Sequence, residues 1–166
     1  MNAILKALVA LLLFSTLLGC VNLNDDSLQK MATLQQKYFV TQVYSTNQAT
    51  MTDYITSLAN LKKSATGENA KIIETEIYLA ESFAYENRAL GESVKLNHIA
   101  FNCSSTEAKA MITYINLAFA SINSAEKNYL ELTASQKEKL RDNYNTLLNG
   151  YKEQINTMKT LVDSKC

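Results

Sequence analysis

The stretch that decides the fold runs from Ala108 to Leu132 and reads AKAMITYINLAFASINSAEKNYLEL. Two sets of its residues recur at a seven-residue spacing, Ala108, Ile115, Ile122 and Tyr129 in one set and Met111, Ala118, Ala125 and Leu132 in the other. This spacing places all of them on one side of an α-helix that packs against a neighbouring helix. Because small alanines alternate with larger side chains, the pattern predicts close packing of long helices.

Helical periodicity extends outward from this stretch in both directions. The predicted helices are 28–63, 70–98, 104–132 and 134–163. A polar run within the first of them predicts a bend or break near residues 45–47, and Gly67 marks a turn. Two capping boxes are expected at helix starts, Ser104 with Glu107 and Thr133 with Gln136.

Composition agrees with a helical protein. The 166 residues include no Pro and four Gly, which is too few for the turns of a β-protein of this size. Short connections between long helices favour antiparallel neighbours. We therefore expect residues 27–166 to form a single all-α domain, an antiparallel up-down-up-down bundle of about four long helices. A helical-repeat architecture is the alternative, but no repeat of fixed period is evident.

The positions of the tyrosines and of two polar residues on these helices can also be predicted. The chain has nine Tyr and no Trp, and we expect the Tyr hydroxyls to reach solvent at the edges of the apolar stripes. Glu86 and Asn87 fall between apolar positions. We interpret them as the edge of a wide apolar stripe. The alternatives are buried polar residues that fix the helix register, or part of a polar cavity.

Charge and residue content exclude several classes of function. Basic and acidic side chains number 16 each, so the chain lacks the basic surplus of nucleic-acid-binding proteins. His98 is the single histidine, and we interpret it as an exposed residue at a helix end. Di-iron, haem-attachment and phosphate-loop motifs are absent. The sequence predicts no catalytic residues, no metal site and no cofactor.

The N-terminal region has the layout of an export signal. Lys6 precedes an apolar run from Ala7 to Leu18, which is shorter than the roughly 20 residues of a membrane-spanning helix. The run ends in Leu17, Leu18, Gly19 and Cys20, and this motif resembles the lipobox of bacterial lipoproteins. An ordinary secretory signal with a chance cysteine and an uncleaved anchor are the alternatives.

The lipobox resemblance implies a processing route and a location. A signal peptidase would remove residues 1–19, and Cys20 would carry a diacylglycerol and an acyl chain that hold the protein in the membrane. Residues 20–26 would then be a short tether. In enterobacterial lipoproteins an Asp after the lipidated Cys retains the protein in the inner membrane. This chain has Val21 there, which favours the outer membrane of the cell envelope.

Two cysteines remain in the expected mature chain. Cys103 lies at the start of the third predicted helix, and Cys166 follows the end of the fourth. Antiparallel helices of similar length bring these two ends together, and thiols oxidise outside the cytoplasm. We therefore expect a structural disulfide between Cys103 and Cys166. A reactive or metal-binding pair is the alternative, although two thiolates do not complete a zinc site.

These observations favour a non-enzymatic function. We expect a lipid-anchored helical module of the bacterial envelope that binds a protein partner. A small-ligand carrier, with a pocket between helices lined by Tyr and Met, is the alternative. A hydrolase that acts on wall or glycan through carboxylates is a third hypothesis.

Overall fold

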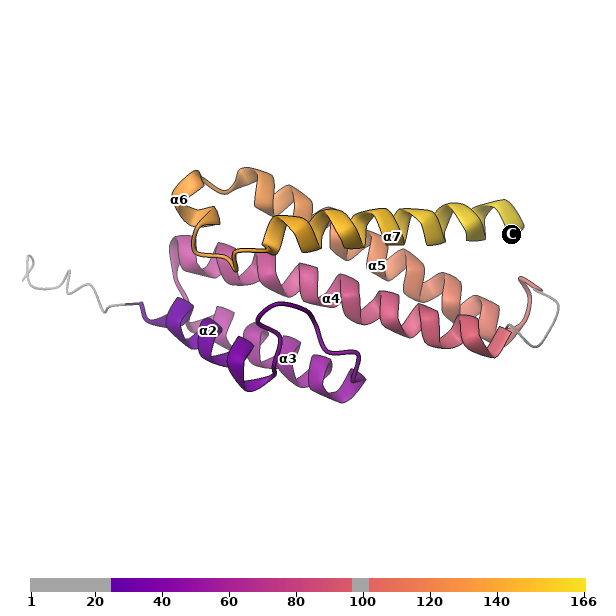
Figure 1. Cartoon of the computed structure of the whole chain (residues 1–166), viewed down its shortest axis with the longest axis horizontal. Helices are drawn as coiled ribbons and strands as arrows, with labels where there is room; N and C mark the ends of the chain where they lie inside the picture. Colours follow the sequence, from indigo (N-terminus) through magenta and orange to yellow (C-terminus); the bar gives the residue numbers. More distant parts are fainter. Residues whose placement is uncertain (1–24, 97–101) are drawn as a thin grey trace, which may run out of the picture.

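The computed structural model describes residues 25–96 and 102–166. Both parts are helical, which confirms the predicted all-α class (Figure 1). The helices assigned in these residues are α2 (Ser27–Lys37), α3 (Gln48–Ser64), α4 (Gly67–Leu96), α5 (Thr106–Glu131), α6 (Ala134–Lys137) and α7 (Tyr144–Lys165). Within the same ranges, no helix has the length and apolar character needed to cross a membrane.

Helices α4 and α5 form a long hairpin at the centre of the molecule. They run side by side in opposite directions and make the most extensive contact between any two helices described (Figure 1). The heptad residues buried on α5 are Ala108, Met111, Ile115, Ala118, Ile122 and Ala125. The predicted close packing of this stretch is therefore confirmed.

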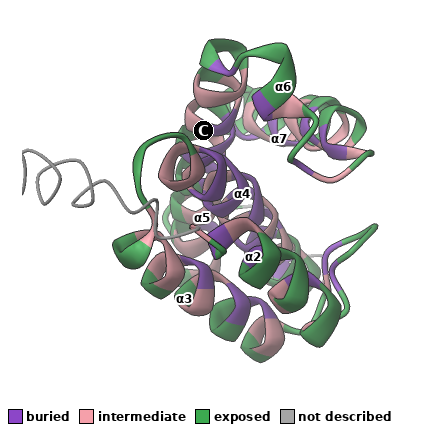
Figure 2. Cartoon of the chain, turned by 90° about the vertical axis from the view of Figure 1, so that its left-hand side faces the viewer, coloured by how far each residue is buried: buried purple, intermediate pink, exposed green. Residues whose placement is uncertain are grey.

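The other helices cover the two sides of this hairpin. Helices α2 and α3 pack along α4 on one side, and α7 packs mainly on α5 on the other (Figure 2). Two apolar clusters result, and the larger one draws on all of these helices and on the loop between α2 and α3. The smaller cluster lies near the C-terminus and contains Ala89, Leu96, Ala108, Met111, Ile115 and Val162.

The first predicted helix, 28–63, is two helices. The expected break is present but longer than predicted, because the chain leaves the helical conformation from Tyr38 to Asn47. Phe39, just beyond the end of α2, has a φ of 55°, and the amide of Val40 donates to the carbonyl of Gln35 at 2.8 Å. The side chain of Asn47 accepts from the amide of Thr50 and starts α3.

The fourth predicted helix, 134–163, is also interrupted. The capping box of Thr133 and Gln136 is confirmed, but the helix it starts, α6, ends at Lys137. A non-helical segment follows before α7 begins at Tyr144. This segment contains Arg141, whose side chain is buried against α4. A continuous helix from residue 134 was therefore a wrong prediction.

The cap of α5 is one residue later than predicted. Ser105, not Ser104, accepts from the amide of Ala108 at 3.1 Å. With Ser105 as the cap, Glu107 falls one position short of the place where its carboxylate could return to the cap amide. The predicted capping box of Ser104 and Glu107 is therefore wrong, although the helix it announced is present.

Candidate functional site

The two predicted disulfide cysteines meet at one end of the molecule. The sulfurs of Cys103 and Cys166 are 2.09 Å apart and their Cα atoms are 5.7 Å apart. Cys103 precedes α5 and Cys166 follows α7, so the predicted meeting of these helix ends is found. This proximity is that of a disulfide pair.

Other predicted site residues lie outside the part of the chain that the structure describes. Leu17, Leu18, Gly19 and Cys20 belong to residues 1–24, and His98 belongs to residues 97–101. Lipidation at Cys20 therefore stays a prediction. Among the residues described, no group of three or more His, Cys, Asp or Glu side chains is arranged to hold a metal ion.

A buried polar cluster joins four segments of the chain around Glu76 on α4. Tyr44 and Tyr54 donate to its Oε1 at 3.0 and 2.8 Å, and Arg141 forms an ion pair with the same oxygen. Glu76 is 0% exposed. We call Glu76, Tyr44, Tyr54 and Arg141 the Glu76 cluster. It connects α3, α4 and the two non-helical segments that interrupt the predicted helices.

Arg141 makes further contacts that explain the break before α7. One of its Nη atoms donates to the carbonyl of Val40 at 2.7 Å, and its guanidinium lies 4.5 Å from the ring centre of Tyr44. Tyr144, three residues later, donates to the carbonyl of Thr75 at 3.0 Å. The non-helical segment 138–143 therefore places Arg141 between the 38–47 loop and α4.

The electrostatics of the Glu76 cluster are those of a sealed site. Burial, and after it the charge of Glu76, raises the pKa of Tyr44 and of Tyr54 well above the usual range for tyrosine. Burial opposes the charge of Arg141, but Tyr44 and Glu76 raise its pKa above the ordinary value. Both tyrosines thus stay neutral donors and Arg141 stays charged. These groups are buried from solvent, so the cluster is suited to holding segments together rather than to turnover.

The structure corrects the predicted position of three of the nine tyrosines. The hydroxyls of Tyr44, Tyr54 and Tyr144 bind inside the protein instead of reaching solvent at stripe edges. The sequence contained one signal for this arrangement. Glu76 follows Ile72 and Ile73 and precedes Ile77, so it interrupts an otherwise apolar face of α4.

A cleft of about 600 Å³ lies between α4 and α7. We call it the α4–α7 cleft. It is lined by Glu86, Leu90, Gly150, Glu153, Gln154, Thr157 and Met158. Leu90 at its edge is 46% exposed. Such mixed concave surfaces, with apolar walls and a few polar groups, are typical of binding sites.

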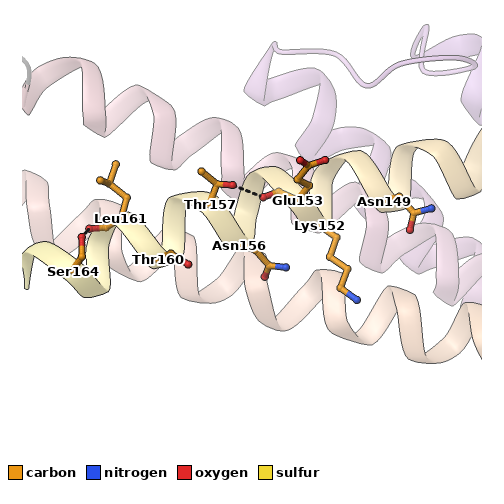
Figure 3. Close-up of a pocket in the computed structure, with 8 residues that line it drawn as sticks. All are labelled: Asn149, Lys152, Glu153, Asn156, Thr157, Thr160, Leu161 and Ser164. Atoms are coloured by element: carbon orange, nitrogen blue, oxygen red, sulfur yellow. Dashed lines mark hydrogen bonds between the residues drawn. The ribbon is translucent and has the colours of Figure 1, made fainter.

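The outer face of α7 continues this surface. A hollow of about 700 Å³ runs along α7 and shares Glu153 and Thr157 with the α4–α7 cleft. In Figure 3, Glu153, Thr157 and Leu161 point to one side of the helix, and Lys152 and Asn156 point to the other. All its lining residues belong to α7, so it is a shallow extension of the cleft rather than a separate site.

Glu86 is the chemically distinctive residue of the α4–α7 cleft. It is 5% exposed, and its Oε2 has no hydrogen-bond partner among the residues described. Burial raises the pKa of Glu86 to about 7. The interpretation of Glu86 as the edge of an apolar stripe is therefore wrong, because its side chain is buried and borders a cleft of mixed polarity. Its neighbour Asn87 donates to the carbonyl of Thr46 at 2.7 Å instead.

Comparison with known proteins adds no relative from which a function could be transferred. No protein-family model, curated protein or solved structure matches the chain. The function must therefore be argued from the chemistry of the residues described above.

Proposed function

We propose that this chain is a lipid-anchored protein of the bacterial envelope that binds a protein partner and has no enzymatic activity. In this proposal α3, α4, α5 and α7 act as an up-down-up-down bundle that presents the α4–α7 cleft. The observation that carries it is the exposed apolar edge of this cleft. Leu90 is 46% exposed and Leu161 on the adjoining face of α7 is 56% exposed. Contiguous exposed apolar surface is typical of protein interaction sites, and the hollows that Leu90 and Leu161 line share Glu153 and Thr157.

The packing of the tyrosines favours this proposal over a small-ligand carrier. A carrier was expected to have a pocket lined by Tyr and Met between its helices. Tyr44 instead stacks on Tyr151 at 6.0 Å, and Phe83 packs on Tyr151 at 5.2 Å. These aromatic rings pack against one another, and the α4–α7 cleft has no Tyr among its lining residues.

The lipid anchor rests on the lipobox resemblance and is tested by labelling. A Cys20→Ala variant should lose incorporation of radioactive fatty acid and should accumulate as an unprocessed precursor. A Cys103→Ala variant is the matched control and should be labelled normally. Normal processing and labelling of the Cys20→Ala variant would disprove the anchor.

Partner binding is tested by site-specific photo-crosslinking in intact cells of the source organism. A photoreactive residue at Leu90 or Leu161 should give a discrete adduct with one protein, and the same residue at exposed Thr56 on α3 should not. Gly150→Leu should abolish the Leu161 adduct, because a Cβ at Gly150 meets nothing within 4 Å and a larger side chain would occupy the cleft. Gly91→Leu is the matched control, since Gly91 also has free space around it on α4 but does not line the cleft. Equal adducts from all three positions would contradict the proposal.

A further inference from the structure

We propose that the α4–α7 cleft receives the side chain of a lysine from the protein partner, and that Glu86 is the carboxylate that binds its ammonium group. This inference rests on the proposed function, because it names the chemistry by which the partner is recognised. It also names an ion pair between Glu86 and the lysine, which the exposed apolar edge of the cleft does not by itself imply.

The first argument is the unpaired carboxyl at the floor of the cleft. A buried polar atom without a partner is unfavourable, so such atoms are rare in folded proteins. Glu76 also has one oxygen without a partner, but it is sealed beneath Tyr44, Tyr54 and Arg141. Glu86 differs because it is one of the residues that line the α4–α7 cleft, so its carboxyl group borders space that a ligand can enter.

The second argument is the charge of the lining. Both charged residues that line the cleft, Glu86 and Glu153, are acidic. The basic residues nearest to them in sequence are engaged elsewhere, as Arg88 donates to Gln48 and Lys152 pairs with Glu126. The cleft therefore offers negative charge and no competing cation among its lining residues, which complements a positively charged group.

The third argument is the shape and polarity of the route to Glu86. The cleft walls include Leu90 and Met158, and Gly150 leaves space on the α7 side. A lysine side chain carries four methylenes that can lie against these apolar walls, and it ends in a compact group with three donors. Arginine would present a wider planar fork in place of this compact group.

Binding of an ammonium group should have a measurable proton signature. Because burial raises the pKa of Glu86 to about 7, more than half of the Glu86 carboxyls are protonated at pH 6.5, and formation of the ion pair should release a proton. The titratable groups of the facing helix closest in sequence to the lining residues include Lys152, which pairs with Glu126, Glu153, which lines the cleft, and Tyr151, whose pKa is raised to about 12 by burial. Tyr151 therefore does not contribute protons near neutral pH.

The first experiment measures the side-chain chemistry on the purified mature chain with n-butylammonium, which is the end of a lysine side chain. Nuclear magnetic resonance should place the bound probe at Leu90 and Met158. Calorimetry near pH 6.5 in two buffers of different ionisation enthalpy should show proton release. Glu86→Gln should weaken binding by about tenfold or more, in line with loss of a charge-assisted hydrogen bond. Glu81→Gln, on the same helix and half-buried, should bind as the wild type does. Equal binding of n-butanol, or unchanged binding by Glu86→Gln, would overturn the proposal.

The second experiment tests the source of the ammonium group. A carbodiimide, which joins a carboxyl directly to an amine, is applied to intact envelopes. Mass spectrometry should find Glu86 linked to a lysine of another protein, and this link should vanish in Glu86→Gln but persist in Glu81→Gln. Photo-crosslinks at Leu90 without a Glu86–lysine link would overturn this inference and leave the proposed function standing. Bound n-butylammonium with no protein adduct by either method would overturn both and assign the cleft to a free amine.

Discussion

Helix α4 carries two buried carboxyl groups ten positions apart, and their surroundings could hardly differ more. Glu76 binds two tyrosine hydroxyls and the guanidinium of Arg141 through one oxygen. Glu86 is almost as deeply buried, yet its Oε2 has no partner among the residues described, and it lines a cleft. The comparison shows that burial alone does not define the role of a carboxyl group. The role depends on whether the chain itself supplies the counter-charge.

Glu76 and Glu86 differ because the segments that cover α4 around Glu76 do not extend to Glu86. Around Glu76, α4 is covered by α3, by the 38–47 loop and by the segment before α7. Helix α3 begins at Gln48, whose side chain lies on α4 between the carbonyl of Ala84 and Arg88. Beyond that point α4 packs on α5 and α7 in the smaller apolar cluster, and the Cys103–Cys166 pair lies at this end.

The largest effect should come from breaking the Glu76 end. Arg141→Leu leaves the carboxylate of Glu76 buried without its counter-charge, and such losses cost about 3–5 kcal/mol. Urea unfolding at neutral pH should show this decrease in the free energy of unfolding. The double variant Arg141→Leu/Glu76→Gln should recover at least half of it, because the buried charge is removed as well. A decrease below about 1 kcal/mol in the single variant would show that the ion pair does not hold this end together.

The second largest loss of stability should come from removing the Cys103–Cys166 pair at the other end of the molecule. Cys103→Ser opens a loop of 63 residues between the paired cysteines, and the loss of such a constraint costs about 2–4 kcal/mol. Native-state hydrogen exchange should rise first near Leu161 and Val162, because the smaller cluster is then the main restraint on the end of α7. Exchange around Tyr54 should change much less. Equal acceleration at both ends would contradict the view that they are stabilised separately.

The third prediction is that stability depends on pH through Glu86. The pKa of Glu86 is raised by burial from 4.5 to about 7, so the folded state binds more protons than the unfolded state between these values. Stability attributable to Glu86 is therefore full below about pH 4.5 and is lost as the pH rises through 7. Glu86→Gln should raise the free energy of unfolding by about 1–3 kcal/mol at pH 8 and change it little at pH 4.5. Thermal unfolding at both pH values measures this, and a gain that is independent of pH would contradict it.

The fold class and the disulfide pair were predictable because their signals are local or follow from helix length. The heptad of α5 lies within a single stretch, and the meeting of Cys103 and Cys166 follows from two helices ending together. The helix breaks were harder to predict. Arg141 lies 65 positions from Glu76 and 101 positions from Val40, so no local pattern around residue 141 indicates its partners.

The α4–α7 cleft could not be predicted for a related reason. Whether Glu86 is solvated, paired or lining a cavity depends on where α3 begins and on how α7 lies along α4. Both depend on the long-range contacts of the 38–47 and 138–143 segments. From the sequence, Glu86 looked compatible with the edge of a wide apolar stripe.

The smallest expected change in stability concerns the 38–47 segment. This segment covers Glu76 but does not cover Glu86. At the end of α2, the amide of Phe39 donates to the carbonyl of Gln36 and the amide of Val40 to that of Gln35. This is the Schellman pattern, and Phe39 occupies its left-handed position with a φ of 55°, where glycine is preferred. Its side chain is 87% exposed, so little packing is lost when it is removed.

Phe39→Gly should therefore increase the free energy of unfolding by about 0.5–1 kcal/mol. Relief of the left-handed strain, about 1–2 kcal/mol, exceeds the added flexibility of glycine in the unfolded chain. Urea unfolding measures the gain, and Val43→Gly in the same loop is the control, because Val43 is exposed but is not in the left-handed region. That control should be neutral or destabilising. A loss of stability in Phe39→Gly would mean that the exposed ring makes a contact that stabilises the loop, and the Glu76 end would then depend on more than its buried polar cluster.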